Sequence, residues 1–352
     1  MEYVLRTIMP DLDSAVGDIT ERVSKLDKIW PSKDVNKKFT PSKIICFVDA
    51  NQHSEVAIKI TLQLSNNFSS HFSLRTIFDQ ELLKLADTDI NHIKESIIGI
   101  VKDLMKENNL PKGITFLEGN SIDSIKNQLS NEYDIVVLPV PYHSNLSDHP
   151  ESSAIGSLGE YLVKNLEKPL FLIPDISYTP ANIFQSVFVV ADEVSDIMFH
   201  SSVIKGMLKE DTHLHFLYLY DEKEILELAI ASKGVLDGDL VTKRVHEKLE
   251  QSGKYTLEKF SQDHKNLDYS VFSGDFTNNI KNLLTKEAAS LLIVIIPAEE
   301  EGYRYLKFEN LIKNRKLEIP ILVLKVPEKT KEPLESTDLD EIAEEQNEFT
   351  EE

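Results

Sequence analysis

The chain has 352 residues, of which 41% are hydrophobic and 28% charged, and this length suggests two globular domains of ordinary size. Its 59 acidic and 38 basic residues give a formal net charge of −21, so we expect neither nucleic acid nor an anionic membrane surface as a partner. The longest strongly apolar run, 291–298, is too short to cross a bilayer. The N-terminus has no basic start and no apolar core. We therefore expect a cytoplasmic protein without membrane insertion.

The two ends of the chain differ in composition from its middle. Residues 1–40 place Ile19, Val23, Leu26 and Ile29 at roughly helical spacing, which predicts an N-terminal helical arm that packs on the core or binds a partner. Residues 328–352 hold eleven acids, two lysines and few apolar side chains. Burial in such a segment cannot offset the entropy lost on ordering, so it is predicted to be a disordered acidic tail, either solubilising or docking on a partner.

Apolar strands and helical patterns alternate between these ends. One segment, 56–64, fits a strand and a helix equally well, and we predict a helix because a right-handed crossover between parallel strands requires one. Strands that are apolar on both faces and alternate with helices predict a parallel sheet covered by helices. The expected strands are 44–50, 73–79, 114–118, 134–140 and 168–174, followed by 187–193, 215–221, 269–273, 291–298 and 319–327.

The two sets of five strands are copies of one unit. GNSIDSIKNQL from Gly119 matches GDFTNNIKNLL from Gly274, an offset of 155, whereas Asp49 matches Asp192 at 143. The offset rises by about 12 between the second and third strands, which predicts an insertion in the second copy. We therefore predict an α/β protein with two tandem, doubly wound, five-stranded parallel-sheet domains at 41–176 and 177–327.

The first copy resembles the universal stress protein family. The residues that carry the resemblance are FVDANQ (47–52), EGNSIDSIKNQLSNEYDIVVLP (118–139) and IGSLGEYLVKNLEKPLFLIP (155–174). The resemblance implies two Rossmann-like domains of the adenine nucleotide alpha hydrolase type. It also implies that the two domains pair within the chain through their last strands, 170–173 and 321–324, as a pseudo-dimer. A further homodimer is left open.

The resemblance also supplies a candidate nucleotide site. Members of the family that bind nucleotide carry a carboxylate after the first strand and, after the fourth, the motif Gly, two residues, Gly, nine residues, Gly, then Ser or Thr. Asp49 and Ala50 occupy the first position here, and Gly156 and Ser157 occupy the end of the motif. These four residues form the candidate site for ATP, ADP or AMP, because glycine lets backbone amides approach phosphate and a helix N-terminus favours an anion.

The sequence departs from that motif at its start. Pro139 and Tyr142 stand where the first two glycines belong, and they remove a backbone donor and add bulk near the phosphate path. The alternative interpretation of Gly156 and Ser157 is a helix cap without a ligand. In the second copy Asp192 is kept, but no Gly-Ser follows and Glu299–Glu301 would repel phosphate. We predict no nucleotide site there, and Asp192 would cap a turn.

Other chemistry-bearing residues form no recognisable catalytic or metal motif. His143 and His149 lie in an enlarged loop, and His213 and His215 alternate along a strand. With Asp148 and Glu151 nearby, the loop pair could form a metal cluster, but two loop histidines without a third ligand are more often solvent-exposed. The strand pair is interpreted as structural, and no metal site is predicted. Cys46, the only cysteine, lies in an apolar strand and is expected to be an inert core thiol. No nucleophile with its base and no phosphate-binding lysine loop occurs, so no catalytic residues are predicted.

Three functions follow from these features. The first is a non-enzymatic, tandem universal-stress-type regulatory protein with at most one degenerate adenine-nucleotide site, in the first domain. The alternative is a ligand-free scaffold or accessory subunit, for example of a transporter, that acts through an unknown protein partner. The third is a nucleotide hydrolase of the same fold group, which no catalytic constellation supports, and fold alone does not establish an activity.

Overall fold

The computed structural model of the chain describes residues 39–49, 52–78, 89–107, 114–118, 129, 133–140, 142, 155–174, 182–191, 194–220, 238–274, 276–296 and 318–326. The predicted acidic tail lies outside these residues, as does the predicted N-terminal arm except for its last two residues. Ala50, Asp192 and most of the enlarged loop at 140–155 also lie outside them.

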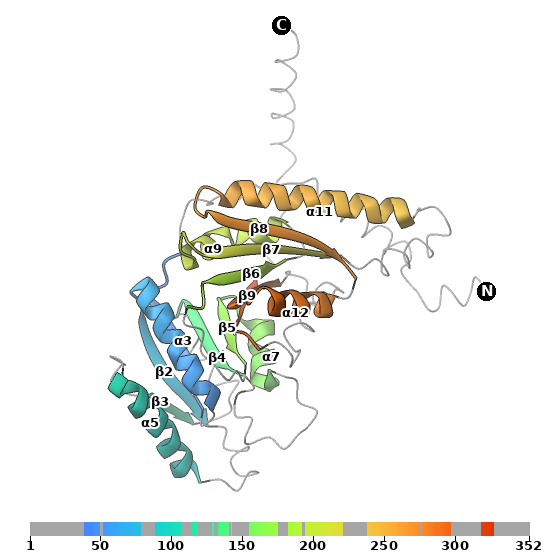
Figure 1. Ribbon diagram of the computed structural model, residues 1–352. Helices are drawn as coiled ribbons and strands as arrows, with labels where there is room; N and C mark the ends of the chain where they lie inside the picture. The colour runs from blue at the N-terminus through green and yellow to red at the C-terminus, as the bar shows by residue number, and fades with distance from the viewer. Residues whose placement is uncertain are drawn as a thin grey trace, which may run out of the picture.

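The described strands form a single ten-stranded sheet, in the order β3-β2-β1-β4-β5-β10-β9-β6-β7-β8 (Figure 1). Each half of the sheet has the same strand order. Read from the outer edge to the centre, it runs third, second, first, fourth and fifth strand of its own unit. The strands are β1 (Lys43–Phe47), β2 (His71–Phe78), β3 (Ile114–Glu118), β4 (Ile135–Pro139), β5 (Leu170–Ile173), β6 (Ser186–Val190), β7 (His213–Tyr220), β8 (Asn266–Ser273), β9 (Leu291–Ile296) and β10 (Ile321–Lys325).

The two units meet where β5 pairs with β10. This pair is antiparallel, with Leu172 opposite Ile321 and Leu170 opposite Val323, whereas the other eight strand pairs are parallel. The structure confirms the predicted fold class and the predicted pairing of 170–173 with 321–324. The pairing also covers two sheet edges that would otherwise present unpaired backbone groups to solvent.

Helices cover both faces of the sheet, as the strands' double-sided apolar character requires. Residues 56–64 lie within a helix, as predicted, because they belong to the crossover from β1 to β2. One face carries α3, α5, α8, α9 and α11, and the other carries α7 and α12. The helices are α3 (Gln52–Phe68), α5 (Ile90–Glu107), α7 (Gly156–Asn165), α8 (Val194–Phe199), α9 (Ser201–Met207), α11 (Gly238–Phe260) and α12 (Phe276–Lys286).

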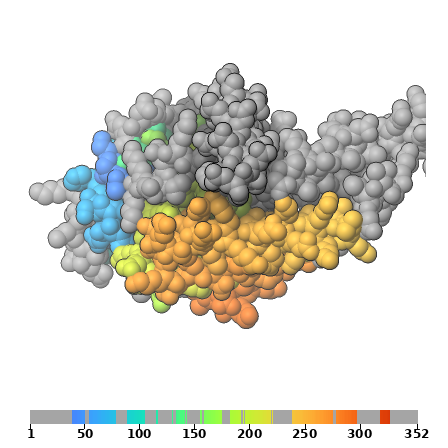
Figure 2. Space-filling model, turned by 90° about the horizontal axis from the view of Figure 1, so that it is seen from above, coloured from blue at the N-terminus to red at the C-terminus, as the bar shows by residue number. Residues whose placement is uncertain are grey.

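The strand registers confirm the internal repeat. Lys43 pairs with His71 in the first unit, and Ser186 pairs with His213 in the second, which reproduces the offsets of 143 and 142. The registers also reproduce the larger offset beyond the insertion, because β2 Leu74 pairs with β3 Ile114 and β7 Phe216 pairs with β8 Tyr269. The helix before the third strand is correspondingly longer in the second unit, 23 residues in α11 against 18 in α5. In the space-filling view, α11 forms much of one outer surface (Figure 2).

Contacts outside the central strand pair also tie the two units together. The N–H of Ile183 donates to Gln63 Oε1 on α3 at 3.1 Å, and Lys325 Nζ donates to the carbonyl oxygen of Lys164 at the end of α7. The predicted boundary between residues 176 and 177 falls outside the described residues. None of the helices in the described part of the chain is both long enough and apolar enough to cross a membrane.

Candidate functional site

The candidate nucleotide site lies at the carboxyl ends of β1 and β4. β1 pairs with β2 on one side and with β4 on the other, so the direction of the strand order reverses between β1 and β4. Open α/β sheets bind ligands outside the carboxyl ends of their strands at such a point. Asp49 follows β1, Tyr142 follows β4, and Phe47, Tyr142 and Ile155 share one apolar cluster. The fold therefore brings the ends of β1 and β4 and the start of α7 together, as the resemblance implies.

Asp49 is buried, with 1% of its surface exposed. Its backbone N–H donates to Ser54 Oγ at 2.8 Å, and the Ser54 hydroxyl donates to Asp49 Oδ1 at 2.6 Å. Ser54 lies in the first turn of α3 and is itself fully buried. This reciprocal pair of hydrogen bonds closes the turn between β1 and α3. Asp49, the carboxylate predicted to contact a ligand, thus has a structural role in this turn.

Tyr142 crosses the point where the ligand is expected. Its ring packs edge-on against Phe47, with 6.4 Å between ring centroids. Its hydroxyl donates to the carbonyl oxygen of Val48 at 3.0 Å and accepts the backbone N–H of Ile77 at 3.1 Å. The side chain therefore starts beyond β4, passes the end of β1 and reaches β2, and it is 9% exposed. The bulk predicted at the second missing glycine thus lies across the carboxyl ends of β1 and β2.

The hydrogen bond that Tyr142 donates to Val48 depends on a neutral hydroxyl. Burial holds the pKa of Tyr142 well above its ordinary value, and the nearby Asp49 carboxylate acts in the same direction, against the opposing effect of the bond from Ile77. A raised pKa keeps the proton on the oxygen throughout the physiological range. The hydroxyl can thus donate to Val48 and accept from Ile77 at the same time.

Two glycines shape the start of α7, one through its backbone conformation and one through close packing. Gly156 is the first residue of α7 and has a φ of +69°, a conformation that favours glycine. The N-cap position is occupied by Ile155, whose side chain makes no capping hydrogen bond. A Cβ at Gly159 would lie 3.0 Å from Ile155 Cβ and 3.5 Å from Val140 Cγ1. Gly156 therefore serves the turn into α7, and Gly159 allows α7 to approach the end of β4. The side chain of Ser157 lies outside the described part of the chain.

The described residues near this site do not include an activated nucleophile. Cys46 is fully buried inside β1, and burial raises its pKa to about 12. The thiolate form, which is the reactive one, is thus strongly disfavoured. This agrees with the prediction of an inert core thiol.

Comparison with solved structures identifies the fold. A protein from Pseudomonas aeruginosa UCBPP-PA14, described provisionally as a universal stress protein, superimposes with a TM-score of 0.52 at 13% identity, over 81% of this chain and 93% of its own. A functionally unknown protein from Pseudomonas aeruginosa PAO1 superimposes with a TM-score of 0.51 at 14% identity, over 87% and 98%. The chain has the universal stress protein fold. A universal stress protein from Archaeoglobus fulgidus DSM 4304 also matches, over 82% of this chain and 98% of its own, with a TM-score of 0.49 at 14% identity. No protein-family model and no curated protein matches the sequence.

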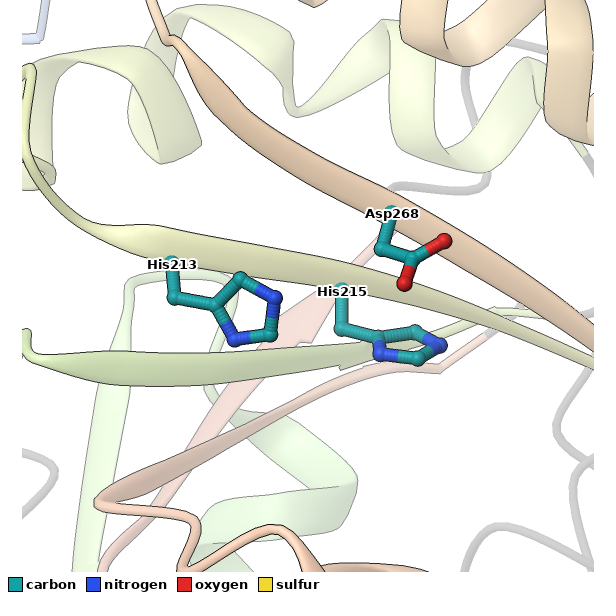
Figure 3. Close-up of side chains that lie close together, drawn as sticks. All are labelled: His213, His215 and Asp268. Carbon is teal, nitrogen blue, oxygen red and sulfur yellow. The ribbon is translucent and has the colours of Figure 1, made fainter.

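Within this universal stress fold, the described residues include one group that could hold a metal ion, and it lies on the second unit. His213 and His215 on β7 and Asp268 on β8 offer ligand atoms that all lie within 4.8 Å of one another (Figure 3). The alternating pair His213 and His215 is visible in the sequence, whereas Asp268 is not, because this third candidate ligand comes from a neighbouring strand. Only the register of β7 and β8 brings it alongside. The other histidine pair, His143 and His149, lies outside the described residues.

Proposed function

We propose that the protein is a non-enzymatic, cytoplasmic regulatory protein of the universal-stress type that works without a nucleotide in its first unit and acts through protein partners. The observation that carries this proposal is Tyr142, whose ring and hydroxyl occupy the end of β1 and reach β2. A nucleotide in the position implied by the resemblance would have to displace a buried aromatic ring and break both of its hydrogen bonds. Breaking buried hydrogen bonds without replacing them is costly.

Asp49 supports the same proposal. A carboxylate that binds ribose must turn an oxygen toward the ligand, whereas Asp49 is 1% exposed and accepts a short bond from Ser54. Hydrogen bonds to an ionised oxygen are among the stronger ones in proteins. Asp49, which the resemblance places near the ligand, and Tyr142, which stands at a missing glycine, are therefore both engaged in buried hydrogen bonds within the protein.

A direct test compares ATP-dependent thermal shifts of the wild-type protein and Tyr142→Gly. The variant restores glycine at the aligned motif position and removes the ring. The proposal predicts no shift for the wild type with millimolar ATP, and a shift only after the ring is removed. A clear ATP-dependent shift of the wild-type protein would contradict it.

Tyr133→Gly is the matched control. Tyr133 is 6% exposed and belongs to the same apolar cluster as Tyr142, but it precedes β4 and so lies at the opposite end of that strand. Both variants lose a buried tyrosine ring, so both are expected to melt at a lower temperature. Only Tyr142→Gly opens the candidate site, and only that variant should respond to ATP.

A further inference from the structure

The second unit carries a polar cluster on the sheet face that α12 covers, near the amino ends of its strands. His213 and His215 are two residues apart on β7, so their side chains lie on one face of the sheet. Asp268 on β8 is the register partner of His215 and therefore shares that face. Figure 3 shows the two imidazole rings side by side and the carboxylate above the ring of His215. The candidate ligand atoms of all three residues lie within 4.8 Å of one another.

His215 is held in one orientation by its surroundings. The ring stacks on Phe188 with 5.0 Å between centroids, and its Nε2 lies 2.9 Å from Ser270 Oγ. Histidines that bind metal usually bond through their second nitrogen to a neighbouring group, which fixes the ring and selects the ligating nitrogen. With Ser270 at Nε2, Nδ1 is the nitrogen positioned to bind a metal.

His215 also lies in the interior of the sheet. The residue is 6% exposed, whereas the neighbouring Asp268 is exposed. The cluster therefore joins a buried imidazole to the surface of the second unit.

A second buried polar atom lies next to the cluster. Ser186 on β6 is the register partner of His213 and lies on the same face. Its hydroxyl oxygen is buried, and no hydrogen-bond partner for it is present among the described residues. Buried hydroxyl groups nearly always have a partner, which is often an ordered water. A water bound at the cluster would supply one.

We propose that His213, His215 and Asp268 bind one divalent ion of the zinc class, with water as the remaining ligand. Two imidazole nitrogens and one carboxylate oxygen with an open fourth position form a ligand set that zinc takes in proteins. Tetrahedral bonds of about 2.1 Å place ligand atoms roughly 3.4 Å apart, so the three side chains close in slightly on binding. Asp268 is exposed and has two carboxylate oxygens, so it can ligate while keeping its bond from the Tyr269 N–H at 2.8 Å.

The ion would join the edge strand β8 to β7. β8 is the last strand of the sheet, and an edge strand has neighbours on one side only. Bound zinc would therefore stabilise the end of the second unit.

The internal repeat provides a natural control for this site. At the offset of 142, His71 corresponds to His213 and Ser73 to His215, and at the offset of 155, Gly113 corresponds to Asp268. The first unit thus retains one of the three ligands. His71 begins β2 and is exposed, so His71→Gln changes a histidine in the equivalent place without touching the proposed site.

The test is a calorimetric titration of the full-length protein, freed of metal with a chelator, with ZnCl₂ and separately with MgCl₂. The wild type should bind one equivalent of Zn²⁺ and no Mg²⁺ at this site. His213→Gln and Asp268→Asn should each weaken Zn²⁺ binding at least tenfold, whereas His71→Gln and the double variant His143→Gln/His149→Gln should bind as the wild type does. The variants spare the buried His215, and their metal-free circular dichroism spectra establish that they are folded.

A second readout reports the geometry of the site. Co²⁺ added in place of Zn²⁺ should give the visible absorption of a tetrahedral complex in the wild type and lose it in Asp268→Asn. The proposal is overturned if the wild type binds no equivalent of Zn²⁺, or if binding persists unchanged in His213→Gln and Asp268→Asn. It is also overturned if binding is lost in the His143/His149 double variant.

Discussion

The hydroxyl of Tyr142 donates a hydrogen bond to the carbonyl oxygen of Val48 over 3.0 Å, and so joins the end of β4 to the end of β1. The same carbonyl accepts the hydroxyl of Thr76 at 3.0 Å, and the Tyr142 oxygen accepts the N–H of Ile77. The three strands that border the candidate site are therefore tied together by one side chain. Open α/β sheets bind their ligands at this edge, outside the carboxyl ends of the strands.

Tyr142→Phe should destabilise the protein without creating a nucleotide site. The ring stays, but the N–H of Ile77 loses a buried partner, and an unsatisfied buried group costs about 1–3 kcal/mol. Urea denaturation measures the loss in unfolding free energy. Tyr133→Phe is the control, because the Tyr133 hydroxyl makes only long contacts of 3.3 and 3.5 Å with Arg75 and Ser73. An equal loss for both variants would contradict the assignment.

Ser54→Ala tests the structural role of Asp49. The substitution removes the donor to Asp49 Oδ1 and the acceptor of the Asp49 N–H, so the unfolding free energy should fall by about 1.5–3 kcal/mol, as for hydrogen bonds to charged groups. Ser73→Ala removes a hydroxyl with one 3.5 Å contact and should change the same quantity by less than about 0.5 kcal/mol. If Ser54→Ala is equally neutral in urea denaturation, the turn does not depend on this pair.

Two glycines in helices should respond in opposite ways to alanine. A Cβ at Gly253 on α11 would lie 2.2 Å from the ring of Tyr269 on β8, so Gly253→Ala should cost about 1–3 kcal/mol through overpacking. A Cβ at Gly99 on α5 would have no atom within 4 Å, so Gly99→Ala should gain about 0.5–1 kcal/mol from reduced chain entropy. Thermal denaturation of the two variants compares them directly. A stable Gly253→Ala protein would mean that α11 packs on β8 differently.

His200 should make the protein less stable as the pH falls. Burial lowers its pKa from 6.5 to about 4, against a backbone hydrogen bond with Lys325. As the pH falls, the histidine of the unfolded chain therefore binds a proton before the histidine of the folded protein does. The contribution of neutral His200 to the unfolding free energy is thus complete above pH 6.5 and declines as the pH falls toward 4. Between pH 7 and pH 5 the wild type should lose up to about 2 kcal/mol more unfolding free energy than His200→Gln. Urea denaturation at both pH values measures this, and identical pH dependence of the two proteins would contradict it.

Much of the fold could be predicted from the sequence, because it rests on repeated local patterns. Continuous apolar strands and amphipathic helices predicted the parallel sheet, and the matching segments at Gly119 and Gly274 predicted two copies and the insertion. The pairing of β5 with β10 came from the family resemblance. The segment 56–64 shows where local pattern fails, since its apolar residues fit both structures and only the crossover rule selected the helix.

The candidate sites were less predictable, because they depend on how distant segments meet. The sequence placed Tyr142 at a missing glycine, but the reach of its hydroxyl to Val48 and Ile77 depends on the path of the chain after β4. His213 and His215 were visible as an alternating pair. Asp268 became their neighbour only through the register of β7 and β8, which sequence periodicity does not determine. The bond between Ser54 and Asp49 spans five residues and was the one contact that local spacing could have indicated.

The proposed function requires that the first unit works without a nucleotide. The most direct measurement is the nucleotide content of freshly purified wild-type protein, which is denatured and filtered so that any released small molecule can be identified by chromatography. The expected result is far less than one equivalent of AMP, ADP or ATP per chain. Near-stoichiometric nucleotide that is lost in Gly156→Trp would contradict it, because the ligand would then lie at the start of α7 in spite of Tyr142.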